Sequence, residues 1–360
     1  MYYKPDIDLV KKRLMGFWNQ ELIDRVCISV IAPKIKGTCI SMFENPNPKN
    51  IDKKQLIDYW TNPDVILKNN IKRIENTYLG GETLPIIFLN FGTSGHCNYY
   101  GSKPSYGQNT IWFDPVISSL DQLHESYNKD ETLKKHLEVS EFLAKKGKDK
   151  FFVSMPDSCG TIDALGHLYG TENLLMDMIT DTQGVTNSVD EVNNGWTDSC
   201  EQFYKTLYTY TNGSSHAWMH LWAPGRLMQM QCDMSVMFSS EMYKKFVIPE
   251  LEKQMQWIEY PVYHFDGVEQ IQHLPLILNL EKLKAIQWTH VAGQLSAVHY
   301  ISTLKKIQNA GKSLIIFTPK EDIPELMDNL SHKGLYLHTE ASDMQEAKDI
   351  INYIKTNTRG

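Results

Sequence analysis

The strongest constraint on the fold is a regular alternation of short apolar runs and longer amphipathic stretches in the second half of the chain. Four such runs begin at Val262, Ala285, Ser313 and Gly334, about 20 to 30 residues apart. The segments between them carry apolar residues at helical spacing. A strand followed by a helix of this length is one βα unit, and repeated units predict a parallel sheet covered by helices.

Earlier apolar runs extend this pattern toward the N-terminus. The full set of predicted strands is Val26–Ala32, Leu84–Phe91, Phe151–Met155, His216–Trp222, Met228–Asp233, Val262–Phe265, Ala285–Trp288, Ser313–Phe317 and Gly334–His338. Eight or nine strands suffice to close a (β/α)8 barrel. An open doubly wound sheet is the alternative, but no glycine-rich dinucleotide loop follows an early strand. We therefore predict an α/β fold of the (β/α)8 TIM-barrel type.

The remaining segments indicate a single barrel domain over residues 1–360, with an N-terminal extension and an insertion. Residues 1–80 contain a predicted helix from Ile7 to Asp24, the first strand and a long loop over 34–55. They end with a helix from Pro63 to about Tyr78. Residues 96–150 are predicted to form an inserted loop and a charged helix. Other predicted helices are Thr171–Ile179, Glu191–Tyr208, Ser239–Tyr260, Leu295–Ala310, Pro319–Asn329 and Asp343–Lys355.

Charge and cysteine content narrow the classes of partner. The formal net charge of -7 argues against a nucleic-acid binder, which usually carries a basic face. Only five of the 36 basic residues are Arg, the usual bidentate partner of carboxylates and phosphates. The six cysteines are scattered without a CxxC pair, and no signal peptide or long apolar run is present. These features predict a cytoplasmic protein without a membrane span.

Polar residues gather where the predicted strands end, which is where the active site of a parallel barrel lies. His264 and Asp266 leave one strand together in the segment YHFDG, and Gly267 permits a tight exit. Residues two apart in an extended chain point to the same face. This geometry suits two ligands of one metal or an acid/base pair. Asp233 and Glu340 end other strands and are candidates for further ligands or a general base.

Other strand-end residues are candidates for substrate binding. They are Asn90, Asp157, Cys232, Trp222, His290, Gln294 and His338. Each also has a structural interpretation, because strand-end polar residues commonly cap turns or satisfy buried backbone groups. Asp157, for example, follows Pro156 and fits the N-cap of a turn.

Three segments carry a family resemblance: GFWNQELIDRVCISV (16–30), CDMSVMFSSEMYKKFVIPELEKQ (232–254) and YHFDG (263–267). AIQWTHVAGQ (285–294) and GLYLHTEASDMQEAKDII (334–351) support it. Together they resemble the uroporphyrinogen decarboxylase superfamily, which includes zinc- and corrinoid-linked methyltransferases. The resemblance extends over roughly residues 10–355. Members are (β/α)8 barrels, so it implies the fold that the strand count favours.

The methyltransferase branch implies a metal site. Its members hold zinc with a His-x-Cys pair and a later Cys, and the zinc activates a thiol toward a corrinoid on a partner protein. His264 matches the His of this motif, whereas Asp266 stands in place of the Cys. Glu340 or His338 would replace the later Cys. Such a His/Asp/Glu set is harder and less thiophilic than one with thiolates, and it is compatible either with zinc or with no metal.

The decarboxylase branch fits less well. It handles a porphyrinogen with eight carboxylates and carries an Arg-rich motif near the N-terminus, whereas Pro33, Lys34 and Lys36 follow the first strand here. The resemblance therefore implies methyl transfer between a small methylated compound, or an acceptor, and a corrinoid protein. It implies a monomer or homodimer, with zinc and the partner's corrinoid as cofactors.

The substrate and the reaction class stay open at this point. Trp112, Trp222 and the Tyr99–Tyr100 pair are candidates to line an apolar pocket for a small methylated compound. Aromatic residues of this kind suit a quaternary ammonium ion, although most pack in cores. Two alternatives to methyl transfer are a decarboxylase or lyase of a small acid, with Asp233 or Asp266 as proton donor, and a non-catalytic ligand-binding barrel.

Overall fold

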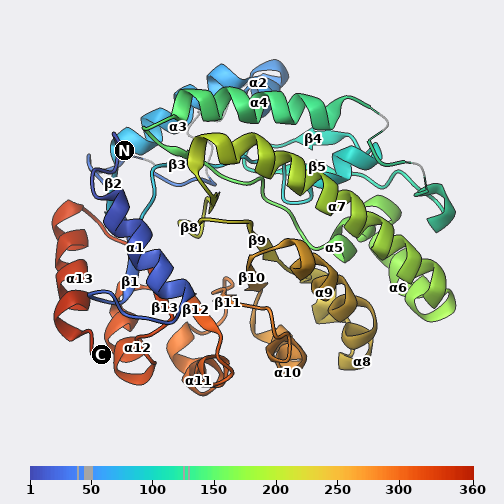
Figure 1. The fold of residues 1–360 in the computed structure, drawn as a ribbon. Coiled ribbons are helices and arrows are strands. Elements are labelled where there is room, and N and C mark those ends of the chain that lie inside the picture. Colours follow the sequence, from blue (N-terminus) through green and yellow to red (C-terminus); the bar gives the residue numbers. More distant parts are fainter. Residues whose placement is uncertain (39, 44–51, 125, 129) are drawn as a thin grey trace.

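The computed structural model describes residues 1–360 except 39, 44–51, 125 and 129 (Figure 1). Its main sheet has seven strands in the order β2-β1-β13-β12-β11-β10-β9, and all neighbours are parallel except β1 and β2. This confirms an α/β fold with a parallel central sheet. The strands are β1 (Cys27–Pro33), β2 (Thr77–Gly81), β9 (Leu227–Met230), β10 (Tyr260–Phe265), β11 (Ala285–Trp288), β12 (Ser313–Phe317) and β13 (Leu335–Glu340).

Three two-stranded sheets accompany the main sheet. They are β3 (Ile86–Ile87) with β6 (Phe152–Val153), β4 (Pro104–Tyr106) with β5 (Ile111–Phe113), and β7 (Ser214–His216) with β8 (Leu221–Ala223). Among the described residues, strand pairing leaves the β3–β6 sheet separate from the seven-stranded sheet. A backbone hydrogen bond of 3.0 Å from Met155 N to Ser215 O links the end of β6 to β7. The hydrogen bonding therefore shows a parallel sheet but not a closed ring.

The predicted strand from His216 to Trp222 is instead a hairpin of β7 and β8. The chain turns between them, and His220 takes a left-handed conformation with φ of 50°. That conformation is uncommon for a residue with a side chain. Two contacts hold it: Tyr336 Oη donates to His220 O at 3.2 Å, and Leu84 N donates to His220 Nδ1 at 3.2 Å. Tertiary hydrogen bonds thus override the apolar pattern of this segment.

Helices cover the outer side of the strands, and α9 to α13 follow one another around the arc of strands in Figure 1. The α-helices are α1 (Ile7–Trp18), α2 (Lys53–Thr61), α3 (Pro63–Asn76), α4 (Thr132–Gly147), α5 (Thr161–Tyr169), α6 (Thr171–Thr180), α7 (Thr182–Thr211), α8 (Ser240–Met242), α9 (Ile248–Trp257), α10 (Leu274–Leu278), α11 (Ile301–Asn309), α12 (Ile323–Asn329) and α13 (Met344–Asn357). Shorter turns are η1 (Gly95–Tyr100), η2 (Leu120–Gln122), η3 (Asp233–Met237), the π-helical η4 (Tyr243–Val247), η5 (Val268–His273), η6 (Ala297–Tyr300) and η7 (Lys320–Asp322).

Several helix boundaries differ from those predicted. The long helix expected over 239–260 is divided by the π-helical turn η4, which precedes Pro249 in the first turn of α9. Proline lacks the N–H that a continuous helix needs, so the hydrogen-bond pattern changes there. In the predicted loop over 34–55, α2 already begins at Lys53, where Asp52 and Gln55 form a capping box. Residues 39 and 44–51 of that loop lie outside the described residues.

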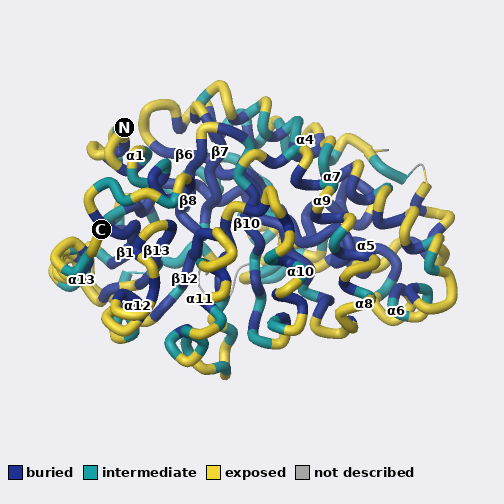
Figure 2. Tube along the Cα trace, turned by 60° about the horizontal axis from the view of Figure 1, so that its bottom comes forward, coloured by how far each residue is buried: buried dark blue, intermediate teal, exposed yellow. Residues whose placement is uncertain are grey.

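Two buried cores lie on opposite faces of the strands. The outer core, between strands and helices, includes Tyr263 and Ile286. The inner core includes Val262 and Ala285 from the same two strands, together with Phe17 of α1. Because adjacent strand residues face opposite sides, each strand contributes to both cores. Figure 2 shows the strands buried and the surrounding helices exposed on their outer sides.

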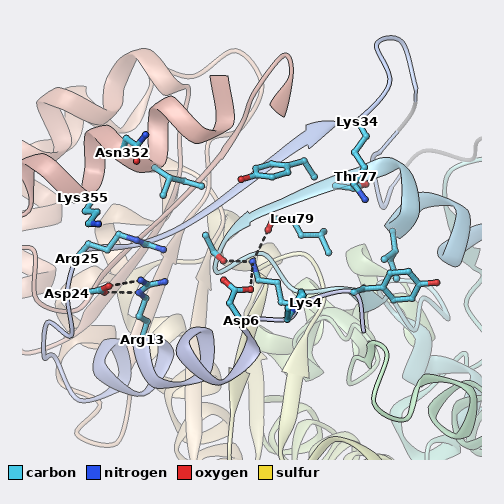
Figure 3. A pocket seen from close by; sticks show the side chains of 16 residues that line it. Lys4, Asp6, Arg13, Asp24, Arg25, Lys34, Thr77, Leu79, Asn352 and Lys355 are labelled. Atoms are coloured by element: carbon cyan, nitrogen blue, oxygen red, sulfur yellow. Dashed lines mark hydrogen bonds and ion pairs between the residues drawn. The ribbon is translucent and has the colours of Figure 1, made fainter. Parts of the chain in front are cut away.

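A buried ion pair fixes the start of the sheet against α1. The Glu82 carboxylate is fully buried, and it accepts two hydrogen bonds of 2.8 Å from Arg25 and one of 2.7 Å from Ile28 N. Arg13 of α1 lies 3.2 Å from the same carboxylate and also pairs with Asp24 (Figure 3). Arg13, Asp24 and Arg25 border a hollow of about 530 Å³. Every oxygen of Glu82 is therefore committed to holding α1, β1 and β2 together.

We expect Glu82→Gln to destabilise the protein by about 3–5 kcal/mol, because it leaves the buried Arg25 guanidinium without its counter-charge. Urea unfolding measures the change. Glu21→Gln, an exposed change on the same side of the molecule, should stay within about 0.5 kcal/mol of the parent. A loss below about 1 kcal/mol for Glu82→Gln would show that the pair does not anchor the fold.

Candidate active site

Three side chains of types that can ligate a metal meet at the carboxyl ends of β9 and β10. One ligand atom each from Asp233, His264 and Asp266 lies within 4.8 Å of the others. His264 is in β10, Asp266 follows it, and Asp233 begins η3 just after β9. The chain leaves β10 through Gly267 at φ of 90°, a conformation that favours glycine. The parallel pairing of β9 with β10 brings the third residue to the His264–Asp266 pair.

The neighbouring strand fixes the orientation of the His264 ring. Gln287 of β11 lies opposite His264 in the sheet, and its Oε1 contacts Nδ1. Thr289 Oγ1 donates to the same Oε1 at 3.1 Å, so the amide oxygen of Gln287 faces both the hydroxyl and the imidazole. An amide oxygen only accepts, so neutral His264 carries its proton on Nδ1. The lone pair of Nε2 then faces Asp266, whose Oδ1 is 3.8 Å away.

A chain of amide side chains supports the carboxylates. Gln231 Nε2 donates to Asp233 Oδ2 at 2.9 Å. Two residues earlier on the same strand, Gln229 Nε2 donates to Asp157, and its Oε1 contacts His216 Nε2. Alternate residues of β9 and its extension therefore all face the site. Each glutamine holds one carboxylate at a fixed position.

One oxygen of the Asp233 carboxylate lacks a hydrogen-bond partner among the described residues. This atom, Oδ1, is buried, and no hydrogen-bond donor reaches it from the described residues. Burial raises the pKa of this carboxyl, and the nearby charge of Asp266 raises it further. An unpaired buried carboxylate oxygen is costly unless a proton or a cation satisfies it. The residues therefore fit a divalent cation such as zinc, which takes imidazole and carboxylate ligands.

A second buried carboxylate holds the chain at this point. Asp163 of α5 accepts hydrogen bonds from the backbone N–H groups of Asp233 and Met234, both at 2.9 Å. Burial raises the pKa of Asp163, and the charge of Asp233 adds to this effect. Asp163 thereby fixes the backbone that carries Asp233.

A cavity of about 340 Å³ lies beside the triad, at the ends of β1, β12 and β13. Trp218, in the turn of the β7–β8 hairpin, lines it and also contacts the triad, with its ring 5.4 Å from that of His264. Phe317 of β12 forms the neighbouring wall, and its ring centroid is 6.0 Å from that of Trp218. The lining also includes Ile31, Ser41, Met42, Phe43, His220, His290, Thr318, Pro319, His338, Thr339 and Glu340.

The structure brings many of the predicted site residues to this region. Asp233, His264 and Asp266 form the triad, and Asp157 joins it through Gln229. His290, His338 and Glu340 line the cavity rather than the triad. Glu340 therefore lines the cavity and is not a member of the triad.

Other predicted residues lie elsewhere. Asn90 lines a small hollow of about 50 Å³, and Gln294 hydrogen-bonds to Glu269 and to Val268 N. Cys232 is buried, and its carbonyl oxygen accepts from Gln270.

The aromatic candidates are separated from the triad. Trp222 belongs to the inner core, where its carbonyl oxygen accepts from Trp18 Nε1 at 3.0 Å. Trp112 is 65% exposed on β5. Tyr99 and Tyr100 are buried in the outer core.

Several residues of the site were not predicted from the sequence. Gln229 and Gln231 precede Asp233 at two-residue steps, and this alternation was a usable signal. Gln287 faces His264 only through the register of two strands, which no local pattern reveals. Trp218 lies in a turn that the sequence assigned to a strand.

Comparisons with known proteins bear on the fold. No family model and no curated protein matches the chain. Among solved structures, a methyltransferase from Methanosarcina mazei matches with a TM-score of 0.59 and 11% sequence identity. The match covers 96% of this chain and 98% of that chain. The likeness therefore shows a shared fold over nearly the whole length of both proteins. Within the described residues, no helix is both long enough and apolar enough to cross a membrane.

We expect neutral His264 to carry its proton on Nδ1, because the amide oxygen of Gln287, which can only accept, contacts that nitrogen. Correlation spectra of ¹⁵N-labelled imidazole rings distinguish the two tautomers, and His264→Gln identifies the signal. Gln287→Leu should move this signal toward the other tautomer, whereas Gln183→Leu, an exposed change on α7, should not. Observation of the Nε2–H form in the unaltered protein would contradict the assignment.

Proposed function

We propose that this protein is a methyltransferase that moves a methyl group between a small compound and a corrinoid on a partner protein. Asp233, His264 and Asp266 would hold a divalent metal, with zinc the best match to the ligand types. The observation that carries the proposal is this triad, in which one ligand atom of each residue lies within 4.8 Å of the others. The Asp233 carboxylate also has a buried oxygen, Oδ1, with no hydrogen-bond donor among the described residues. The fold shared with a methyltransferase supports the same conclusion.

When bound, a metal in this position supplies Lewis acidity, which lowers the pKa of a coordinated thiol or polarises a substrate. Residues of the chain orient and ionise the ligands that this metal needs. Gln287 keeps the His264 ring oriented, and Asp233 must lose its proton before it can act as a ligand. The methyl group leaves its donor atom without the bonding electron pair, which stays on that atom. The acceptor supplies the pair for the new bond.

We also propose that the strands form a (β/α)8 barrel. The support is the inner core, which joins side chains of β3 and β6 to those of six strands of the main sheet: Cys27, Ile86, Phe152, Leu227, Val262, Ala285, Ile315 and Tyr336. The β7–β8 hairpin adds Leu221 and Trp222 to the same core. One core shared by β3, β6 and the strands of the main sheet is the arrangement that a barrel interior requires. The match of the M. mazei methyltransferase covers nearly the full length of both chains, so the proposed barrel would be a property of the shared fold.

The alternative of a decarboxylase acting on a small acid has less support. An acidic substrate needs a cationic partner, and Arg or Lys usually provides it. No Lys or Arg belongs to the described lining of the cavity beside the triad. The remaining alternative, a barrel that only binds a ligand, is distinguished from an enzyme by turnover.

We expect the metal-free protein to bind about one equivalent of Zn²⁺ in isothermal titration. Binding should weaken as the pH falls from about 8 to about 6. The raised pKa of Asp233 means that its proton must leave before the metal binds, and protons compete more strongly at low pH. Proton uptake by the buffer during the titration measures this release.

Single variants separate the triad from the cavity lining. His264→Ala, Asp266→Ala and Asp233→Ala should each abolish or strongly weaken Zn²⁺ binding. Glu340→Gln should leave the affinity within about threefold, because Glu340 lies outside the triad. Unchanged Zn²⁺ binding in His264→Ala, or its loss in Glu340→Gln, would place the metal elsewhere.

We expect the zinc-loaded protein to methylate reduced free cobalamin from a donor among methylated amines, sulfides and ethers. The absorbance change of the corrinoid follows the reaction. His264→Ala should lose at least about 100-fold in rate. Equal rates in His264→Ala and the parent protein, or a decarboxylated product formed without corrinoid, would refute the proposed function.

A further inference from the structure

The cavity between Trp218 and β13 contains features that the metal triad does not use. Its volume of about 340 Å³ is in the range of small-molecule sites. Trp218 is half-buried, and its ring makes edge contacts with Phe317 at 6.0 Å and His216 at 4.6 Å. The rings of Phe317 and His338 are 4.5 Å apart. Aromatic rings therefore form one continuous wall that ends at His264.

The backbone and side chains of this wall are held in place. His220 stands in its left-handed conformation because Tyr336 and Leu84 hydrogen-bond to it. The His220 ring stacks on that of His338, with the ring centroids 5.6 Å apart and an angle of 15° between the ring planes. Non-glycine residues in such a conformation cluster at ligand sites, where the surrounding structure over-determines them. Contacts within the protein thus fix the positions of the His220 and His338 rings in this wall.

The charged side chain that lines the cavity is acidic, and one cation, the Arg73 guanidinium, acts on the lining residue His220 from outside. Glu340 lines the cavity, and its described lining contains no Lys or Arg. The Asp157 carboxylate lies close to the Trp218 side chain, and Asp266 lies beyond His264. Burial lowers the pKa values of His220 and His338, the latter to about 4, so both rings are neutral near pH 7. An aromatic wall with nearby carboxylates attracts a cation and repels an anion.

We propose that this cavity binds a small quaternary ammonium compound, with its methyl groups against the faces of Trp218 and Phe317. The statement that this ligand is the methylated substrate rests on the proposed function. The binding site itself stands on the cavity alone. The positive N-methyl groups match the ring faces, and one of them would lie beside Trp218, which also contacts the triad histidine. The sequence pointed to such a ligand through Trp112 and Trp222, but the cavity is built from other rings.

A pair of isosteric probes tests the inference on the metal-free protein. Choline and 3,3-dimethylbutan-1-ol have the same shape, but only choline carries a positive charge. Isothermal titration should show choline binding at least about tenfold more tightly than the neutral alcohol. Trp218→Leu should weaken choline binding about 3- to 30-fold, and Trp218→Phe should retain most of it. Trp112→Leu, an exposed aromatic change outside the cavity, should leave it unchanged.

The possible outcomes separate this inference from the proposed function. Equal affinity for both probes, or no binding of choline, overturns the inference even if methyl transfer from another donor is observed. Choline binding that depends on Trp218 supports the site even if no methyl transfer occurs. Thermal melting checks that Trp218→Leu is folded. If it is not, Phe317→Leu provides the second test, with the same 3- to 30-fold loss expected.

Discussion

The alternation of side chains along parallel strands determines both the interior of this protein and its candidate site. In β10, Val262 enters the inner apolar core, and His264 and Asp266 follow on the same side toward the carboxyl end. Because β9 runs parallel to β10, Asp233 arrives at the same edge. Helix α1 packs its apolar side chains into the inner core. One geometric rule thus places apolar residues in the inner core and ligand-binding residues at the carboxyl ends.

The candidate site concentrates acidic groups in a buried place, which is unfavourable for stability. Asp157, Asp163 and Asp233 all have pKa values raised by burial. Amide side chains and backbone N–H groups hold them in position, but Asp233 Oδ1 remains unpartnered among the described residues. Groups kept at such a cost are typical of functional sites. A bound cation would supply the missing partner and lower the repulsion between Asp233 and Asp266.

The sequence predicted the parts of this arrangement that depend on local periodicity. The regular spacing from Val262 onward predicted the parallel α/β sheet, and the i, i+2 spacing of His264 and Asp266 placed both side chains on one face. Features that depend on tertiary contacts were missed. Gln287 meets His264 only through strand register, and the hairpin around Trp218 forms because Tyr336 and Leu84 hold His220 in its conformation. Aromatic content suggested a cation-binding pocket, but only the fold could select which rings build it.

The central claim is that a divalent metal binds to one imidazole and two carboxylates. X-ray absorption at the zinc edge of the Zn²⁺-loaded protein tests it most directly. We predict a first shell of nitrogen and oxygen atoms at about 2.0–2.2 Å, with the outer-shell signal of a single imidazole that disappears in His264→Ala. Sulfur at about 2.3 Å, or an unchanged spectrum in His264→Ala, would contradict the assignment of Asp233, His264 and Asp266 as the metal ligands.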